Sequence, residues 1–126
     1  VFAKTIGVNQ KAMDNERETD IRALHGQLEA YYANYGNYPL LSEINSSSWR
    51  TTNLKGLDPT ALQDPNGTSQ QLASSPSAGA YSYQVYDING ITVCTVATKC
   101  QKYTLTATID GQMNGTNVYT KTSLAN

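Results

Sequence analysis

The 126-residue sequence has few of the side chains on which catalytic and metal-binding sites depend. It contains one histidine, His25, and two cysteines, Cys94 and Cys100. A nucleophile activated by histidine needs a neighbouring partner motif, and the sequence around His25 offers none. A structural zinc site needs four ligands, which these three residues do not complete. The sequence therefore favours a protein that is not an enzyme and carries no cofactor.

Charge and long apolar runs are also scarce. Charged residues make up 15% of the chain and the net charge is −1, so nothing indicates direct nucleic-acid binding, which depends on clustered lysine and arginine. No run reaches the ~20 apolar residues of a membrane-spanning helix. The first residues, VFAKTI, are more apolar than those that follow, and we interpret them as the end of a longer hydrophobic segment that precedes Val1.

Oxygen ligands for calcium are present but scattered along the chain. The candidates are the side chains of Asp58, Asp64, Asn66, Asp87 and Asp110. Ca²⁺ prefers such oxygen ligands, but their spacing matches no compact calcium-binding loop. Calcium therefore stays an alternative to the absence of any cofactor.

Residues 15–39 carry the clearest helical pattern. Apolar residues recur at spacings of three and four, the period of an amphipathic helix: Ile21, Leu24, Leu28, Tyr31, Tyr32 and Tyr35. Gly36 is suited to end a helix in the left-handed conformation, and Pro39 prevents its continuation. We predict a spine helix over residues 1–36. At 1.5 Å per residue, residues 4–35 would span roughly 45–50 Å, so part of the helix should protrude from the body.

Charged residues in the first half of this helix are spaced to pair with one another. Asp14 and Arg17 lie three residues apart, and Glu18 and Arg22 lie four apart. Such pairs support an exposed helix by about 0.2–0.5 kcal/mol each. We interpret the segment as a solvated face, with a contact to a neighbouring copy as the alternative.

Residues 37–79 form a long loop rich in Ser, Thr, Asn, Gly and Pro. One short helical turn is expected over residues 40–44, with Ser42 as its candidate N-cap. Four isolated apolar residues should pin the loop to the body: Trp49, Leu54, Leu57 and Leu62. Because the loop is too long for a mere connection, it should have a packing or functional role.

From residue 80 the apolar pattern changes to a period of two, which is typical of β-strands. Alternate apolar residues of 81–85 share one face. The Asn-Gly pair at 89–90 is a strong hairpin signal, and the alternation in residues 91–96 predicts a second strand.

The alternation is cleanest in residues 102–110, where threonines face one way. The side chains facing the other way are Tyr103, Leu105, Ala107 and Ile109. An Asp-Gly pair at 110–111 or an Asn-Gly pair at 114–115 provides the next turn, and residues 116–122 form the last strand. One apolar and one polar face indicate an antiparallel sheet.

These patterns predict an α+β fold in a single domain over residues 1–126. One long N-terminal helix packs against a three- to four-stranded antiparallel β-sheet over residues 80–126, and residues 37–79 join the two. The expected core lies between the helical stripe of residues 21–35 and the apolar side chains of residues 103–109.

The two cysteines favour a disulfide, Cys94–Cys100, and hence an oxidising compartment. Closing so short a loop contributes roughly 2 kcal/mol through the entropy of the unfolded chain. Two free, partly buried thiols are the alternative. The disulfide would staple the connection between the second and third predicted strands.

The stretch TDIRALHGQLEAYYANYGNYP resembles the segment that follows the membrane helix in type IV pilins and in the related type II secretion pseudopilins. The matching positions are Asp20, Ile21, Leu24, Leu28, Tyr31, Tyr32, Gly36, Tyr38 and Pro39. The later order of a variable loop, a small sheet and a short disulfide is similar too. The close spacing of the cysteines differs from the larger disulfide-bounded loop of Gram-negative pilins and favours a small pilin from another lineage.

The resemblance implies a pilin-like fold and a structural subunit without an active site. Its partners would be other copies of itself in a helical filament, other pilins and the pilus assembly machinery. It would be anchored in the membrane by an N-terminal helix before assembly and would end in an extracellular, cell-surface filament. The expected function is a type IV pilus subunit that serves adhesion, twitching-type motility or DNA uptake.

Two other functions remain open at this point. The first is the major pseudopilin of a type II secretion system, for which calcium binding would be a sign. The second is a secreted glycan- or protein-binding module that uses Trp49 and exposed tyrosines.

Overall fold

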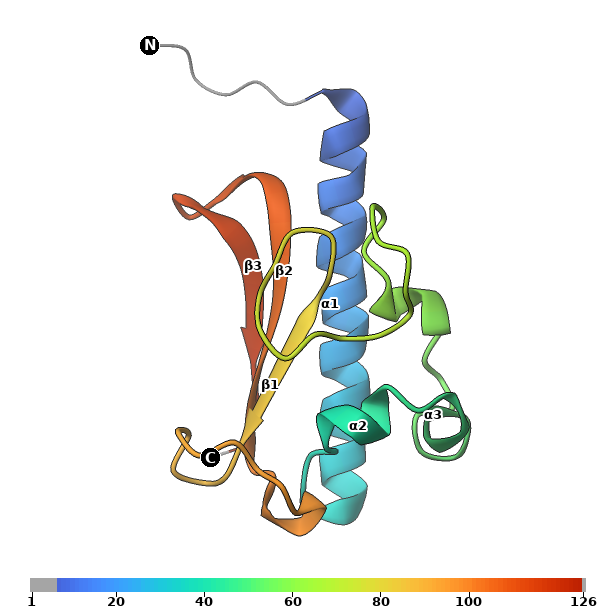
Figure 1. Cartoon of the computed structure of the whole chain (residues 1–126), viewed down its shortest axis with the longest axis vertical. Coiled ribbons are helices and arrows are strands. Elements are labelled where there is room, and N and C mark those ends of the chain that lie inside the picture. Colours follow the sequence, from blue (N-terminus) through green and yellow to red (C-terminus); the bar gives the residue numbers. More distant parts are fainter. Residues whose placement is uncertain (1–6, 126) are drawn as a thin grey trace.

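A long helix packed across a three-stranded antiparallel sheet dominates the chain (Figure 1). The computed structural model describes residues 7–125. Its main elements are α1 (Val8–Tyr35), β1 (Ser82–Tyr86), β2 (Lys102–Met113) and β3 (Thr116–Thr122), with the strand order β1-β2-β3. The predicted α+β arrangement is confirmed. Residues 1–6, which we expected in the spine helix, lie outside the described residues.

Local hydrogen bonds define both ends of α1. The backbone N–H of Gly7, just before the helix, donates to the Gln10 side chain at 2.7 Å. At the other end Gly36 has a φ of 74°, and its N–H donates to the carbonyl of Tyr32 at 2.8 Å. A residue with a Cβ would be strained in this conformation, which explains why glycine ends the helix.

The apolar stripe of α1 packs onto the sheet only in part. Ile21, Leu24 and Leu28 are buried, whereas Tyr31 and Tyr32 are half-buried. The placement of Tyr35 in the helix–sheet core is wrong, because its side chain is 59% exposed. Its ring lies on Tyr31, with centroids 4.5 Å apart, and both residues belong to the side of α1 that faces the linking segment rather than the sheet.

β2 is the central strand and supplies the sheet's contribution to the core. Its buried apolar side chains are Tyr103, Leu105, Ala107 and Ile109, and Thr106 on the opposite face is buried as well. The strand continues to Met113 through the Asp-Gly pair at 110–111, so that pair makes no turn. The turn forms at Asn114-Gly115 instead, where both residues have positive φ, 53° and 79°. This is the backbone that a tight two-residue hairpin requires.

Residues 91–96 do not form the predicted strand. A turn at Asp87–Gly90 follows β1, but beyond it the chain pairs with the strand only at the isolated bridge between Tyr86 and Val93. The disulfide then draws the chain into a short 3₁₀ helix, η2 (Ala97–Lys99). The alternation of apolar residues was therefore misleading, because these residues lie beside β1 but pair with it only at this one bridge.

The segment between α1 and β1 contains more regular structure than we predicted. It forms α2 (Leu41–Ile44), α3 (Ser47–Asn53) and η1 (Pro59–Leu62). Ser42 is not the N-cap of α2; that position belongs to Leu40, whose N–H donates to the Glu43 carboxylate at 2.9 Å. Leu54 and Leu62 are buried, while Trp49 and Leu57 pack partly buried against the core.

Tyrosine hydroxyls form hydrogen bonds inside the core. Glu29 of α1 accepts hydrogen bonds from Tyr38 at 2.8 Å and from Tyr103 of β2 at 2.6 Å. Tyr83 of β1 donates to the carbonyl of Pro39 at 2.7 Å. Burial raises the pKa of each of these three phenols, which therefore remain protonated donors. The rings thus supply apolar area while their hydroxyls join α1, the sheet and the chain after α1.

Asp20 of α1 is the acceptor for a fourth tyrosine. The Tyr81 hydroxyl donates to its carboxylate at 2.6 Å. Partial burial nevertheless raises the pKa of Asp20 to about 6, and the negative charges of Glu16, Asp64 and Asp58 act in the same direction. The folded state therefore binds a proton at Asp20 more tightly than the unfolded chain does.

We predict that Asp20→Asn flattens the dependence of stability on pH. In the wild type, stability from Asp20 is present below pH ~4 and is lost as pH rises through about 6, since the pKa is raised on folding. Asparagine does not titrate, so the variant should gain about 1 kcal/mol relative to the wild type at pH 7, after a discount for solvent screening. Urea unfolding at pH 4, 5, 6 and 7 measures this difference.

Asp58→Asn is a comparison variant with the opposite expected sign, although it also removes one of the charges that raise the pKa of Asp20. Asp58 is exposed, and hydrogen bonds from Thr60 lower its pKa. Its stabilising effect is therefore lost as pH falls, which is the opposite sign. Parallel pH profiles for the wild type and Asp20→Asn would contradict the prediction.

Candidate functional site

Arg17 of α1 lies in a buried charge cluster. The side chain is 2% exposed and its partner Asp64 is 1% exposed. Nε and Nη2 of Arg17 donate to the two carboxylate oxygens of Asp64 at 2.9 and 3.1 Å, and Nη1 donates to Asp14 at 2.7 Å and to Asp110 at 3.1 Å. The interpretation of this segment as a solvated face is wrong for Arg17, because Asp64 and Asp110 come from distant parts of the chain to meet it.

This cluster also accounts for two of the candidate calcium ligands. Asp64 and Asp110 do converge, but on the guanidinium of Arg17, whose pKa their hydrogen bonds raise. Asp58 instead caps η1, and Asp87 lies in the connection between β1 and β2. Over residues 7–125, no group of three or more His, Cys, Asp or Glu side chains is placed to hold a metal ion.

His25, the residue that we considered for catalysis, contacts the sheet. Its Nε2 lies 3.0 Å from the carbonyl oxygen of Thr122, and its ring meets the Tyr103 ring edge-on at 6.1 Å. The half-buried imidazole thus helps to pack α1 against the end of β3.

The disulfide Cys94–Cys100 is confirmed, with a Cα–Cα distance of 5.4 Å. Because residues 91–96 form no strand, it lies within the connection between β1 and β2. Both cysteines are buried, and the backbone N–H of Cys94 donates to the carbonyl of Val85 in β1 at 3.2 Å. The disulfide-bonded loop is therefore attached to the sheet edge at its base.

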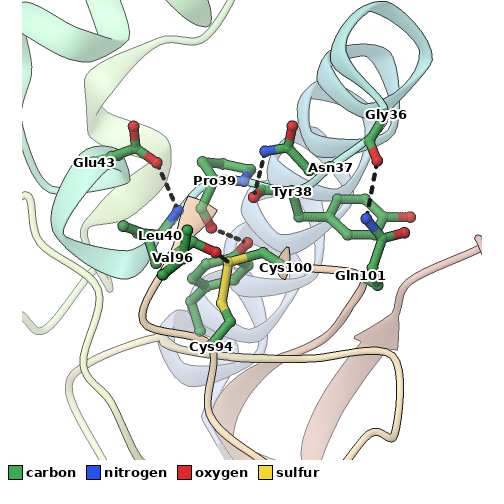
Figure 2. The surroundings of a disulfide bond; sticks show 11 residues. Gly36, Asn37, Tyr38, Pro39, Leu40, Glu43, Cys94, Val96, Cys100 and Gln101 are labelled. Atoms are coloured by element: carbon green, nitrogen blue, oxygen red, sulfur yellow. Dashed lines mark hydrogen bonds between the residues drawn. A yellow bond between two sulfur atoms is a disulfide. The ribbon is translucent and has the colours of Figure 1, made fainter. Parts of the chain in front are cut away.

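The same loop holds the chain that follows α1 (Figure 2). The N–H of Tyr38 donates to the carbonyl of Cys100 at 2.8 Å, and the Gln101 side chain donates to the carbonyl of Gly36 at 3.0 Å. Tyr32 in turn donates to Gln101 at 3.1 Å. The motif residues Gly36, Tyr38 and Pro39 thus lie against the disulfide-bonded loop and form one rigid end of the molecule.

The outer side of this end carries an unusual set of exposed apolar side chains. Over residues 88–96, which we call the apolar loop, the exposed fractions are 59% for Ile88, 81% for Ile91, 62% for Val93 and 51% for Val96. A cleft of about 370 Å³ lies beside it, lined by Gly90, Lys102 and Leu124 among others. Exposed apolar side chains that gather in one region mark interaction surfaces, so this loop, with four of them within nine positions, is the candidate functional site.

Three aromatic residues form a smaller cluster at the end of α1. The Tyr31 ring lies 4.5 Å from that of Tyr35 and 5.3 Å from that of Trp49, a residue of α3. Trp49 is half-buried, and Tyr35 is the most exposed of the three. The residues that we considered for glycan binding therefore pack mainly on one another.

Comparison with protein-family profiles, curated proteins and solved structures gave no match for this chain. Throughout residues 7–125, no helix has both the length and the apolar composition needed to cross a membrane. We therefore describe the chain as an α+β protein with a disulfide-bonded loop, and we propose its function from its geometry.

We predict that Arg17→Met destabilises the protein by about 3–5 kcal/mol, because it leaves the buried carboxylate of Asp64 without a counter-charge. Arg17→Lys keeps the charge but loses the two-point contact, so its effect should be intermediate. Arg22→Met is the control, since Arg22 pairs with Glu18 at an exposed site and donates to the Tyr119 hydroxyl at 3.1 Å, and such exposed pairs contribute little to stability. Equal losses for the two methionine variants in urea unfolding would show that the cluster has no special role.

Replacing Cys94 and Cys100 together by serine should lower the free energy of unfolding by about 2 kcal/mol, because the unfolded chain regains its loop entropy. Amide exchange of Tyr38 and Gln101 should accelerate more than exchange between β2 and β3, which should rise only by the factor that corresponds to the loss of global stability. A reductant should reproduce both effects in the wild type and leave the serine variant unchanged. If exchange of the Tyr38 amide is unchanged, the disulfide does not stabilise the hydrogen bond between the loop and the chain that follows α1.

Proposed function

We propose that this protein is the globular part of a type IV pilin, a structural subunit that acts by assembling with many copies of itself. The main support for the proposal is that the two ends of α1 differ in how far they are covered by the rest of the fold. The second half of α1 packs on the sheet through Ile21, Leu24 and Leu28, whereas its first turn extends past the sheet with mostly exposed side chains (Figure 1). A single subunit has no evident use for such an extension, but a filament built around packed helices does.

The end of α1 gives further support. Within the pilin-like motif, Tyr38 donates to Cys100 of the disulfide-bonded loop, Gly36 accepts from Gln101 just after it, and Pro39 accepts from Tyr83 of β1. This arrangement gives the residues of the motif a common structural purpose, which is to join the spine to the sheet. In this proposal an N-terminal helix anchors the subunit in the membrane until the assembly machinery adds it to a cell-surface filament.

The major pseudopilin of a type II secretion system is the alternative with the same architecture. The charge cluster bears on this choice, because a guanidinium occupies the place where Asp64 and Asp110 converge. A calcium requirement, which would indicate a pseudopilin, has no cluster of ligands to support it among residues 7–125. The pilin proposal is therefore the stronger of the two.

The proposal predicts that antibodies against residues 7–125 label thin surface filaments along their length, in cells that produce the full-length protein. Deleting the gene should remove these filaments, and restoring it should bring them back. Label confined to the cell envelope, together with loss of protein secretion in the deletion strain, would favour a pseudopilin. Uniform release of the protein as a monomer would contradict both.

A further inference from the structure

Arg50 of α3 is a buried arginine without an acidic partner. The residue is 8% exposed, and its Nη1 donates to the carbonyl of Ile44, the last residue of α2, at 2.6 Å. The other two arginines of the chain, Arg17 and Arg22, both form ion pairs with carboxylates, whereas Arg50 pairs with no carboxylate of residues 7–125. Burying a guanidinium is costly unless an anion compensates its charge, so Arg50 is the group in this fold that most needs an anionic ligand.

Two guanidinium nitrogens of Arg50, Nε and Nη2, donate to no group in residues 7–125. In Arg17 the same two nitrogens donate to the two oxygens of Asp64 at 2.9 and 3.1 Å, which is the two-point contact that arginine makes with carboxylates and phosphates. The buried side-chain atoms without a partner in the described part of the chain are Ser82 Oγ and Asp87 Oδ1. Neither nitrogen of Arg50 is therefore sealed from solvent, and an anion can reach both.

A cleft of about 190 Å³ lies beside Arg50, between α3 and the chain that leads into η1. Figure 1 shows α3 on the side of α1 that faces away from the sheet. Lys55 and the Ser47 hydroxyl line the cleft together with Arg50, and no acidic residue does. Asp58, the acidic residue nearest to Lys55 in sequence, accepts hydrogen bonds from Thr60 at 3.0 and 2.9 Å and pairs with neither cation. The cleft thus carries two positive charges without a negative one.

We propose that this cleft binds the phosphate group of a phosphate ester, with Arg50 as the two-point donor and Lys55 as the second cation. A phosphate monoester carries close to two negative charges at pH 7 and offers three acceptor oxygens, so it matches the two cations and leaves an oxygen for the Ser47 hydroxyl. The bond from Nη1 to Ile44 holds the guanidinium in place before the ligand arrives, which lowers the entropic cost of binding. The inference goes beyond the proposed function and does not depend on it.

Titration of ¹⁵N-labelled residues 1–126 with glycerol phosphate, at pH 7 and constant ionic strength, tests the site. The Arg50 Nε–H resonance and the amide resonances around the cleft should shift and saturate. Arg50→Lys keeps the charge but loses the two-point contact, so it should weaken binding by about 10-fold or more. Lys55→Gln removes one exposed charge and should weaken binding about 3- to 10-fold. Lys99→Gln is the matched control, because Lys99 is equally exposed but lies in η2, and it should leave the affinity unchanged.

Thermal unfolding of each variant shows whether the fold is retained. If Arg50→Lys does not fold, Lys55→Gln decides, because Lys55 is exposed and its loss should leave the fold intact. Shifts that grow without saturation and spread equally to Lys99 and Lys102 would overturn the proposal, as would equal affinities for the wild type and Lys55→Gln. Acetate that shifts the same resonances at the same concentration would overturn the assignment of a phosphate ligand.

The phosphate group can belong to a soluble ester or to a lipid headgroup, and vesicles distinguish these sources. If it belongs to a lipid, phosphatidylcholine vesicles that contain phosphatidic acid should sediment the wild type but not Lys55→Gln. Vesicles of phosphatidylcholine alone should sediment neither. Saturable binding of glycerol phosphate without sedimentation identifies a soluble ester. Absence of binding in both experiments would overturn the proposal and leave the proposed function untouched.

Discussion

The guanidinium of Arg17 joins the three parts of the fold in one buried cluster. Asp14 comes from α1, Asp64 from the linking segment and Asp110 from β2. A buried charge is tolerated only while its partners stay in place, so these contacts fix how far the sheet and the linking segment can slide along the helix. The apolar stripe alone could not do this, because Ile21, Leu24 and Leu28 cover only about two turns. Glu29 and its tyrosine partners hold the other end of the same interface.

Local sequence patterns were sufficient to predict the helices and strands whose apolar residues recur at one constant spacing. The helix over residues 8–35, the apolar face of β2 and the last strand over residues 116–122 appear as the sequence indicates, and the α1 stripe does so over Ile21, Leu24 and Leu28. The pairing of Arg17 was not readable, since its partners lie 47 and 93 positions away and a nearer aspartate at position 14 offers a sufficient local explanation. α3 was missed because its helix is short and polar, and it begins with the Ser46 side chain accepting from the N–H of Trp49.

The candidate site was harder to predict than the fold. Residues 91–96 alternate as a buried strand would, yet Ile91, Val93 and Val96 are exposed. Exposure depends on which segments come to lie beside the loop, and no sequence period encodes that. One signal was available: two cysteines six positions apart must bend the chain between them, which is incompatible with a straight strand through the first of them. The prediction for the Tyr35 side chain was wrong for a related reason. The helical period identifies which residues share a face of the helix, but not which segment covers that face.

The attachment of the disulfide-bonded loop to Tyr38 and Gly36 links surface shape to the redox state of the surroundings. A thiol pair does not close the loop, so the covalent closure beside the end of α1 exists only where the cysteines are oxidised. The shape of this end of the molecule therefore depends on an oxidising environment, whereas the pairing of β2 with β3 does not.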